Sequence, residues 1–145
     1  MNDEELLRSF EDQTLPYDAW THRAHVKVAF LYLRQNGLTD DGFWCSVNKM
    51  RTGIQRYNAA QQVPEGPTSG YNETTTVAFM QLVAATMAAY GELFPTPHAD
   101  AFCDTHPQLR CKEALRLFYS PARRSLPEAK TRFVEPDLAP LPRFE

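Results

Sequence analysis

Apolar residues recur every three or four positions through most of the first 119 residues of this 145-residue chain. That spacing places them on one face of an α-helix, whereas a half-buried β-strand would alternate apolar and polar residues, and no strongly alternating segment is present. The pattern therefore predicts an all-α fold. The expected helices cover residues 3–12, 18–36, 39–58 and 72–90 and a segment starting at residue 107, with a short helical turn over 97–105.

Glycines and short polar residues mark the expected helix ends. Thr39 is suited to cap the third helix, because its hydroxyl oxygen can accept a hydrogen bond from an exposed amide. Gly37 is expected to end the second helix, and Gly91 to end the helix over 72–90. The Pro- and Gly-containing residues 64–70 predict a loop between the third and fourth helices.

The last predicted helix starts at Pro107, because proline is favourable at the first position of a helix. At helical spacing its apolar side chains share one face, which we expect to lie against the core. These side chains are Cys111, Ala114, Leu115 and Phe118.

The composition changes after Tyr119, where prolines recur at positions 121, 127, 136, 140 and 142. Such a segment allows only short helical turns and extended stretches. Because apolar residues remain between the prolines, we expect residues 120–145 to wrap along the helices; a partly disordered tail is the alternative. The chain is thus predicted to form one helical domain over residues 1–145, a compact bundle of about five helices with this tail packed on it.

Composition and charge restrict the partners of the chain. Its 43% hydrophobic residues can form a core without disulfides or structural metals. With a net charge of −3 and one compact basic run at 121–124, nucleic-acid binding is not expected. No apolar run approaches the roughly 18 residues of a membrane-spanning helix. The acidic first residues and three cysteines without a Cys-x-x-Cys pair favour a cytoplasmic location.

Two of the four histidines, His22 and His25, lie three residues apart near the start of the helix expected over 18–36. Side chains at this spacing share one helix face, and the same face continues with Val26 and Ala29. Both imidazoles are therefore expected to point inward. The exposed amides at a helix start favour neutral imidazole, the form that binds a metal or accepts a proton.

Glu73 opens the helix over 72–90 on a face that is otherwise mostly apolar. If the two helix starts lie at one end of the bundle, His22, His25 and Glu73 converge. They would then form a 2-His-1-carboxylate site for one divalent ion, Fe, Mn or Zn. Without a metal, a histidine would act as general base and Glu73 as acid. Two structural alternatives stay open: Glu73 complements the helix dipole, and the histidines bond loop carbonyls.

Four further residues are candidates for contacts to a small molecule. Tyr71 and Asn72 precede Glu73, Tyr57 lies near the end of the preceding helix, and Arg123 can bind a carboxylate or phosphate through charge-assisted hydrogen bonds. Each also has a structural interpretation. Tyr71 and Asn72 can form a turn or a cap, Tyr57 can pack in the core, and Arg123 can hold the tail.

Three segments resemble a group of small, mostly uncharacterised bacterial helical proteins: Trp-Thr-His-Arg-Ala-His-Val at 20–26, Arg-Tyr-Asn at 56–58 and Thr-Ser-Gly-Tyr-Asn-Glu-Thr at 68–74. The shared patterns are Trp-Thr-His-x-x-His and Gly-Tyr-x-Glu-Thr. Similar proteins often carry His where this chain has Asn72, so the resemblance implies that a third histidine is absent here. The resemblance therefore favours Glu73 as the third ligand, or chemistry without a metal. The resemblance implies no particular activity or substrate.

These features predict a small-molecule enzyme with a polar pocket at the starts of the helices over 18–36 and 72–90. With a metal, the expected chemistry is of the lyase, isomerase, hydrolase or oxygenase type. Without one, it is an isomerisation, elimination or cyclisation. The alternative is a non-catalytic helical binding or regulatory module, which the Pro-rich tail and the absence of a specific catalytic signature favour. A homodimer is compatible with either.

Overall fold

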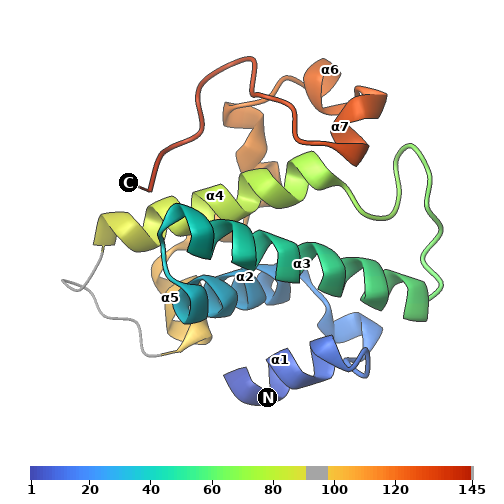
Figure 1. Ribbon diagram of the computed structural model, residues 1–145, viewed down its shortest axis with the longest axis vertical. Helices are drawn as coiled ribbons and strands as arrows, with labels where there is room; N and C mark the ends of the chain where they lie inside the picture. The colour runs from blue at the N-terminus through green and yellow to red at the C-terminus, as the bar shows by residue number, and fades with distance from the viewer. Residues whose placement is uncertain (91–97, 145) are drawn as a thin grey trace.

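The computed structural model describes residues 1–90 and 98–144, and its regular elements in these ranges are all helical (Figure 1). The predicted all-α fold is confirmed. The α-helices are α1 (Asp3–Glu11), α2 (His22–Asn36), α3 (Asp40–Ala60), α4 (Glu73–Tyr90), α5 (Ala99–Thr105), α6 (Pro121–Arg124) and α7 (Pro127–Thr131), and the 3-10 helices are η1 (Tyr17–Ala19), η3 (Pro107–Arg110) and η4 (Lys112–Leu117).

Helices α2, α3 and α4 form the centre of the molecule, with α1 at one end and α6 and α7 at the other (Figure 1). Helix α4 contacts α2, α3, α7 and η4. Its sequence is apolar on most sides, as expected for a helix that is surrounded by others. Within the described residues, no helix has both the length and the hydropathy needed to cross a membrane.

The helix ends follow local signals in the sequence. The hydroxyl of Thr39 accepts a hydrogen bond from Gly42 N, and Gly37 ends α2 with a φ of 87°, so both predicted caps are confirmed. Helix α2 begins at His22 rather than at residue 18. The reason is that Thr21 caps it by accepting from Ala24 N, while the residues before it form η1. The predicted helix end at Gly91 and the first residue of the turn over 97–105 lie outside the described residues; His98 and α5 form the rest of that turn.

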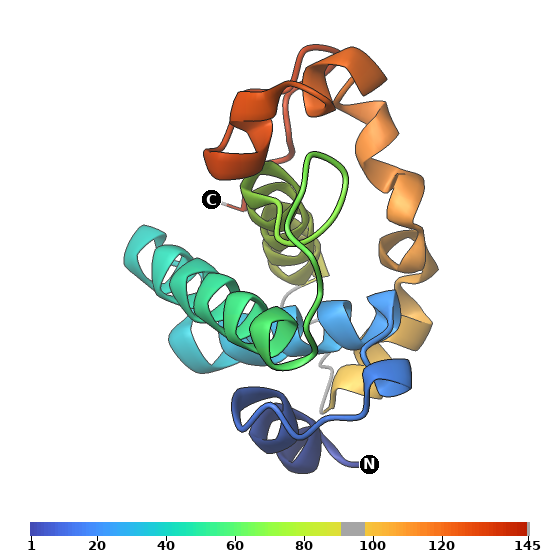
Figure 2. The same ribbon diagram turned by 90° about the vertical axis from the view of Figure 1, so that its right-hand side faces the viewer.

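The prediction of a single helix that starts at Pro107 is wrong. The chain forms two 3-10 helices separated at Cys111, which has an extended backbone (φ −89°, ψ 115°) and an exposed side chain. Leu109 of η3 and Leu115 of η4 are both buried, so each of the two short helices places one leucine in the core. Figure 2 shows this segment as an arch between α5 and α6.

The C-terminal tail packs along the helices, as predicted. Ala129, Val134 and Leu141 are buried, and the ring of Phe144 stacks on Phe43 at 4.9 Å between centroids. The buried hydroxyl of Tyr119 donates to the carbonyl of Val134 at 2.7 Å. The tail is therefore held by both apolar burial and backbone-directed hydrogen bonds.

Replacing Thr74 with valine is expected to lower the free energy of unfolding by about 1–3 kcal/mol. The Thr74 hydroxyl is buried on α4, donates to Arg132 O at 3.0 Å and accepts from Val134 N at 3.2 Å. Valine keeps the shape and leaves both backbone groups unpaired. Urea unfolding and the rate of proteolysis within residues 132–144 would measure the effect.

Thr86 provides the matched control, because among the described residues its hydroxyl donates to Leu82 O of the same helix and makes no contact with the tail. The same change there is expected to stay within about 0.5 kcal/mol. Equal losses in the two variants would show that Thr74 does not hold the tail.

Candidate functional site

A cavity of about 400 Å³ lies where the starts of α2 and α4 face the middle of α3. It has the size of a small-molecule site. Its walls are mostly apolar, with a few hydroxyl, imidazole and guanidinium groups. The lining residues are Trp20, Thr21, His22, His25, Val26, Ala29, Met50, Ile54, Thr75, Thr76, Phe79, Met80, Val83 and Arg124.

His25 lies in this wall and its ring is fixed on two sides. The imidazole stacks on Trp20 with 3.8 Å between centroids, and its Nδ1 lies 2.7 Å from the carbonyl oxygen of Thr21. A carbonyl only accepts hydrogen bonds, so Nδ1 carries the proton. In the neutral ring the acceptor lone pair is therefore on Nε2.

His22 lines the same cavity with the opposite tautomer. Its Nε2 lies 2.9 Å from the carbonyl oxygen of Leu109 in η3, so Nε2 donates and the lone pair is on Nδ1. The edge of the ring packs against Phe79, with 4.9 Å between centroids. His22 thus joins the start of α2 to η3 and α4, in line with the structural interpretation of a histidine bonded to a loop carbonyl.

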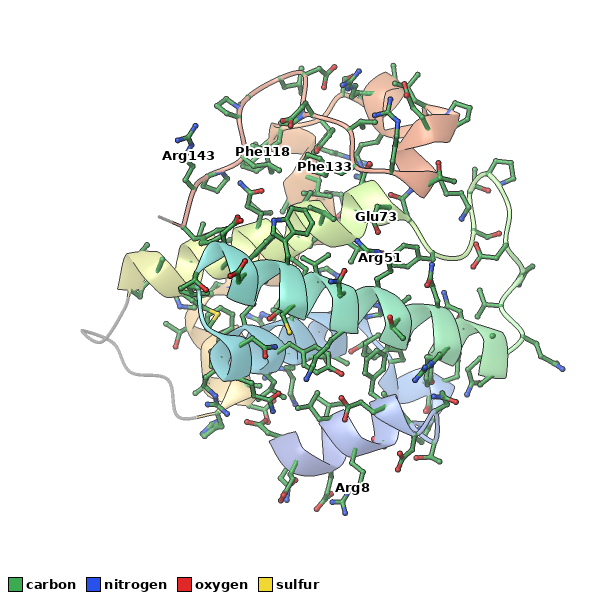
Figure 3. All side chains as sticks on the ribbon, viewed as in Figure 1. Arg8, Arg51, Glu73, Phe118, Phe133 and Arg143 are labelled. Atoms are coloured by element: carbon green, nitrogen blue, oxygen red, sulfur yellow. The ribbon has the colours of Figure 1, made fainter. Side chains whose placement is uncertain are left out.

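Glu73 does not lie in this cavity. Its carboxylate accepts hydrogen bonds from Arg51 Nε (2.9 Å) and Nη2 (2.6 Å) and from the hydroxyl of Tyr71 (2.6 Å). Figure 3 shows Arg51 and Glu73 side by side, where α3 and α4 are neighbours. Burial alone would raise the pKa of Glu73, but the hydrogen bonds from Arg51 and Tyr71 outweigh it and the pKa is lowered. Glu73 is held as a carboxylate in an ion pair.

The structure therefore brings together two of the three predicted ligands. His22 and His25 share one cavity, whereas Glu73 lines a separate hollow with Arg51 and Tyr71. In the part of the chain that the structure describes, no group of three or more His, Cys, Asp or Glu side chains is placed to hold a metal ion.

Three of the four other predicted contact residues are divided between two hollows and the core. Tyr71 and Asn72 line a smaller hollow of about 290 Å³, which shares His25 with the main cavity. Asn72 caps α4 by accepting from Thr75 N at 2.9 Å. Tyr57 lines neither hollow: it is fully buried and donates to Leu15 O at 2.7 Å.

Of the two adjacent arginines, the one that reaches the main cavity is Arg124, not Arg123. Ser120 caps the short α6 by accepting from Arg123 N, and successive side chains on a helix point about 100° apart. Arg123 turns to the tail and donates from Nε to Glu135 O at 2.8 Å. Arg124 turns to α4 and donates from Nη2 to the hydroxyl of Thr75 at 3.2 Å.

Sequence reasoning missed Arg124, Thr75 and Thr76 as parts of the cavity. Thr75 and Thr76 lie two and three residues after Glu73, and helical spacing places Thr76 on the same face as Phe79 and Met80. That spacing was the available signal for Thr76. No local signal distinguishes Arg124 from Arg123.

Comparison with known proteins adds no relative: no family model, curated protein or solved structure matches this chain.

Proposed function

We propose that this chain is a small-molecule enzyme whose active site is the 400 Å³ cavity and whose general base is His25. The observation that carries the proposal is the hydrogen bond from His25 Nδ1 to Thr21 O, which fixes the tautomer with its lone pair on Nε2. A base held in one tautomer and orientation can accept a proton without first rearranging. The reaction class is an isomerisation, elimination or cyclisation that begins with proton removal from the bound molecule.

The other polar groups of the cavity suit the second half of such a reaction. Arg124 and the hydroxyl groups of Thr75 and Thr76 lie in the same lining. Removing a proton from carbon leaves negative charge on a neighbouring atom, and fixed donors lower the energy of that charge. His22 serves as a positioning residue, because its bond to Leu109 O holds the cavity wall to η3.

The described donor atoms do not fit a 2-His-1-carboxylate metal site. Glu73 is committed to Arg51 and Tyr71, and among the described residues no other His, Cys, Asp or Glu joins His22 and His25 to complete a metal site. The proposed proton transfer therefore uses side chains of the cavity alone. The metal-dependent form stays a prediction, and elemental analysis of tag-free protein would test it.

We also retain the expectation of a cytoplasmic location, in keeping with three free cysteines.

A His25→Gln variant is expected to slow proton exchange on carbon by on the order of 100-fold or more. Glutamine fills similar space but cannot take up a proton near neutral pH. The assay incubates the protein in D₂O with a panel of hydroxy, keto and unsaturated organic acids and their neutral esters. Nuclear magnetic resonance then detects loss of carbon-bound proton signals or the appearance of new compounds.

His98→Gln is the control for this experiment. His98 is exposed at the start of α5, accepts from Ala101 N and does not line the cavity. Wild-type rates in the His25 variant would contradict the proposed base. Compounds that bind the wild-type protein and undergo no change would favour the non-catalytic binding module.

A further inference from the structure

We propose that the ligand of the main cavity is an organic anion with an apolar body and one acidic head group, which pairs with Arg124. This inference rests on the proposed function and deepens it, because it names the substrate class of the same site. It is carried by a cation that has no ion-pair partner among the described residues, by the composition of the lining and by the position of the cavity in the fold.

Arg124 is partly buried, and its guanidinium donates a hydrogen bond to the Thr75 hydroxyl. Within residues 1–90 and 98–144, no carboxylate lies within ion-pair distance of Arg124, whereas Arg23 and Arg51 each have such a partner. Burial, and then the nearby charge of Arg116, lower the pKa of Arg124. A half-desolvated cation beside another cation is unfavourable, and an anion placed against it removes that cost.

The lining of the cavity also favours negative charge. None of its described residues is Asp or Glu, although the chain as a whole carries a net charge of −3. His22 is the first residue of α2, and Thr75 and Thr76 belong to the first turn of α4. The amides at these two helix starts add a positive potential to the charge of Arg124.

The remaining wall defines the rest of the ligand. It is formed by apolar side chains from α2, α3 and α4, including Met50, Ile54, Phe79, Met80 and Val83. One cation and an apolar wall suit a single acidic group on a hydrocarbon or aromatic body. A polyphosphate would need several cations and would leave the apolar wall without contacts.

A matched pair of fluorescent dyes tests this directly. Anilinonaphthalene sulfonate and phenylnaphthylamine share one ring system, and only the first carries an anionic group. Wild-type protein is expected to bind the sulfonate more tightly than the neutral dye. Arg124→Met should weaken sulfonate binding about tenfold or more, because a charge-assisted pair is lost, and leave the affinity for the neutral dye unchanged.

Arg8→Met is the control for loss of one positive charge and should change neither affinity, since Arg8 is exposed on α1 and does not line the cavity. Circular dichroism of each variant shows that it is folded. The inference is overturned if Arg124→Met keeps the sulfonate affinity within about twofold of wild type, or weakens both dyes alike. It is also overturned if the wild-type protein has no preference for the anion.

The dye experiment requires no turnover and the exchange experiment requires no dye. Loss of the anion preference with an intact effect of His25→Gln would reject the substrate class alone. An Arg124-dependent preference without any exchange on carbon would reject the catalytic proposal alone.

Discussion

Replacing Phe10 with alanine is expected to lower the free energy of unfolding by about 3–5 kcal/mol. The Phe10 ring is fully buried and stacks on Trp20 at 4.5 Å between centroids. It also fills the space over Gly53 of α3, where an added Cβ would come within 2.5 Å of the ring. Alanine would leave a cavity that neither α1 nor α3 can close without moving.

Phe10→Ala is also expected to disturb the candidate active site. Phe10, Trp20 and His25 form a continuous column of stacked rings from α1 to the cavity. Urea unfolding measures the loss of stability, and Leu117→Ala is the control because Leu117 is 72% exposed. The control should change stability by no more than about 0.5 kcal/mol, and a Phe10 effect below about 1 kcal/mol would contradict the prediction.

Replacing Arg51 with methionine is expected to lower the free energy of unfolding by about 2–3 kcal/mol, because it leaves the Glu73 carboxylate without its cation. The side chain of Glu73 is 13% exposed, so water replaces little of the lost interaction. The double variant Arg51→Met/Glu73→Gln should recover part of the loss. Chemical denaturation of the wild type and both variants would measure these differences.

The effect of pH supplies a second readout for this pair. The pKa of Glu73 is lowered in the folded protein, so the ion pair contributes its full stability above the ordinary glutamate pKa of 4.5. That contribution is lost as the pH falls through the folded-state pKa. Arg51→Met should therefore make stability less dependent on pH in the acid range. If the free energy of unfolding falls equally with decreasing pH in the wild type and in Arg51→Met, this assignment is contradicted.

The exposed pair of Glu128 on α7 and Arg132, the C-cap of this helix, is the control for Arg51 and Glu73. Both side chains of this i,i+4 pair are more than 40% exposed. Arg132→Met is expected to cost no more than about 1 kcal/mol, since exposed ion pairs contribute little. A cost similar to that of Arg51→Met would show that burial does not set the value of the pair.

The features predicted correctly depend on residues that are near one another in the sequence. Thr39 caps the helix that follows it, Gly37 ends the helix before it, and the apolar spacing identifies the buried faces of α2 and α3. The segment after Pro107 was mispredicted because apolar residues three apart suit both α- and 3-10 helices. The choice depends on where Leu109 and Leu115 meet the core.

Only the part of the site that belongs to a single helix could be predicted from the sequence. His22 and His25 share a wall because both belong to the start of α2. The partner of Glu73 is Arg51, 22 residues earlier on another helix, and spacing along the chain carries no information about that pairing. The same holds for Arg124, whose orientation depends on how the tail docks against Thr75.

The docking of the tail has a consequence for how the cavity and the fold are coupled. Arg124, which donates to Thr75, lies between Tyr119 and the residues of the tail that are anchored at Thr74 of α4 and at Tyr119. Under the proposed role of Arg124, occupancy by an anion and anchoring of the tail are thermodynamically linked. By reciprocity, each then strengthens the other by the same free energy. A substitution that loosens the tail anchor would thus weaken anion binding, even though the substituted side chain itself makes no contact with the ligand.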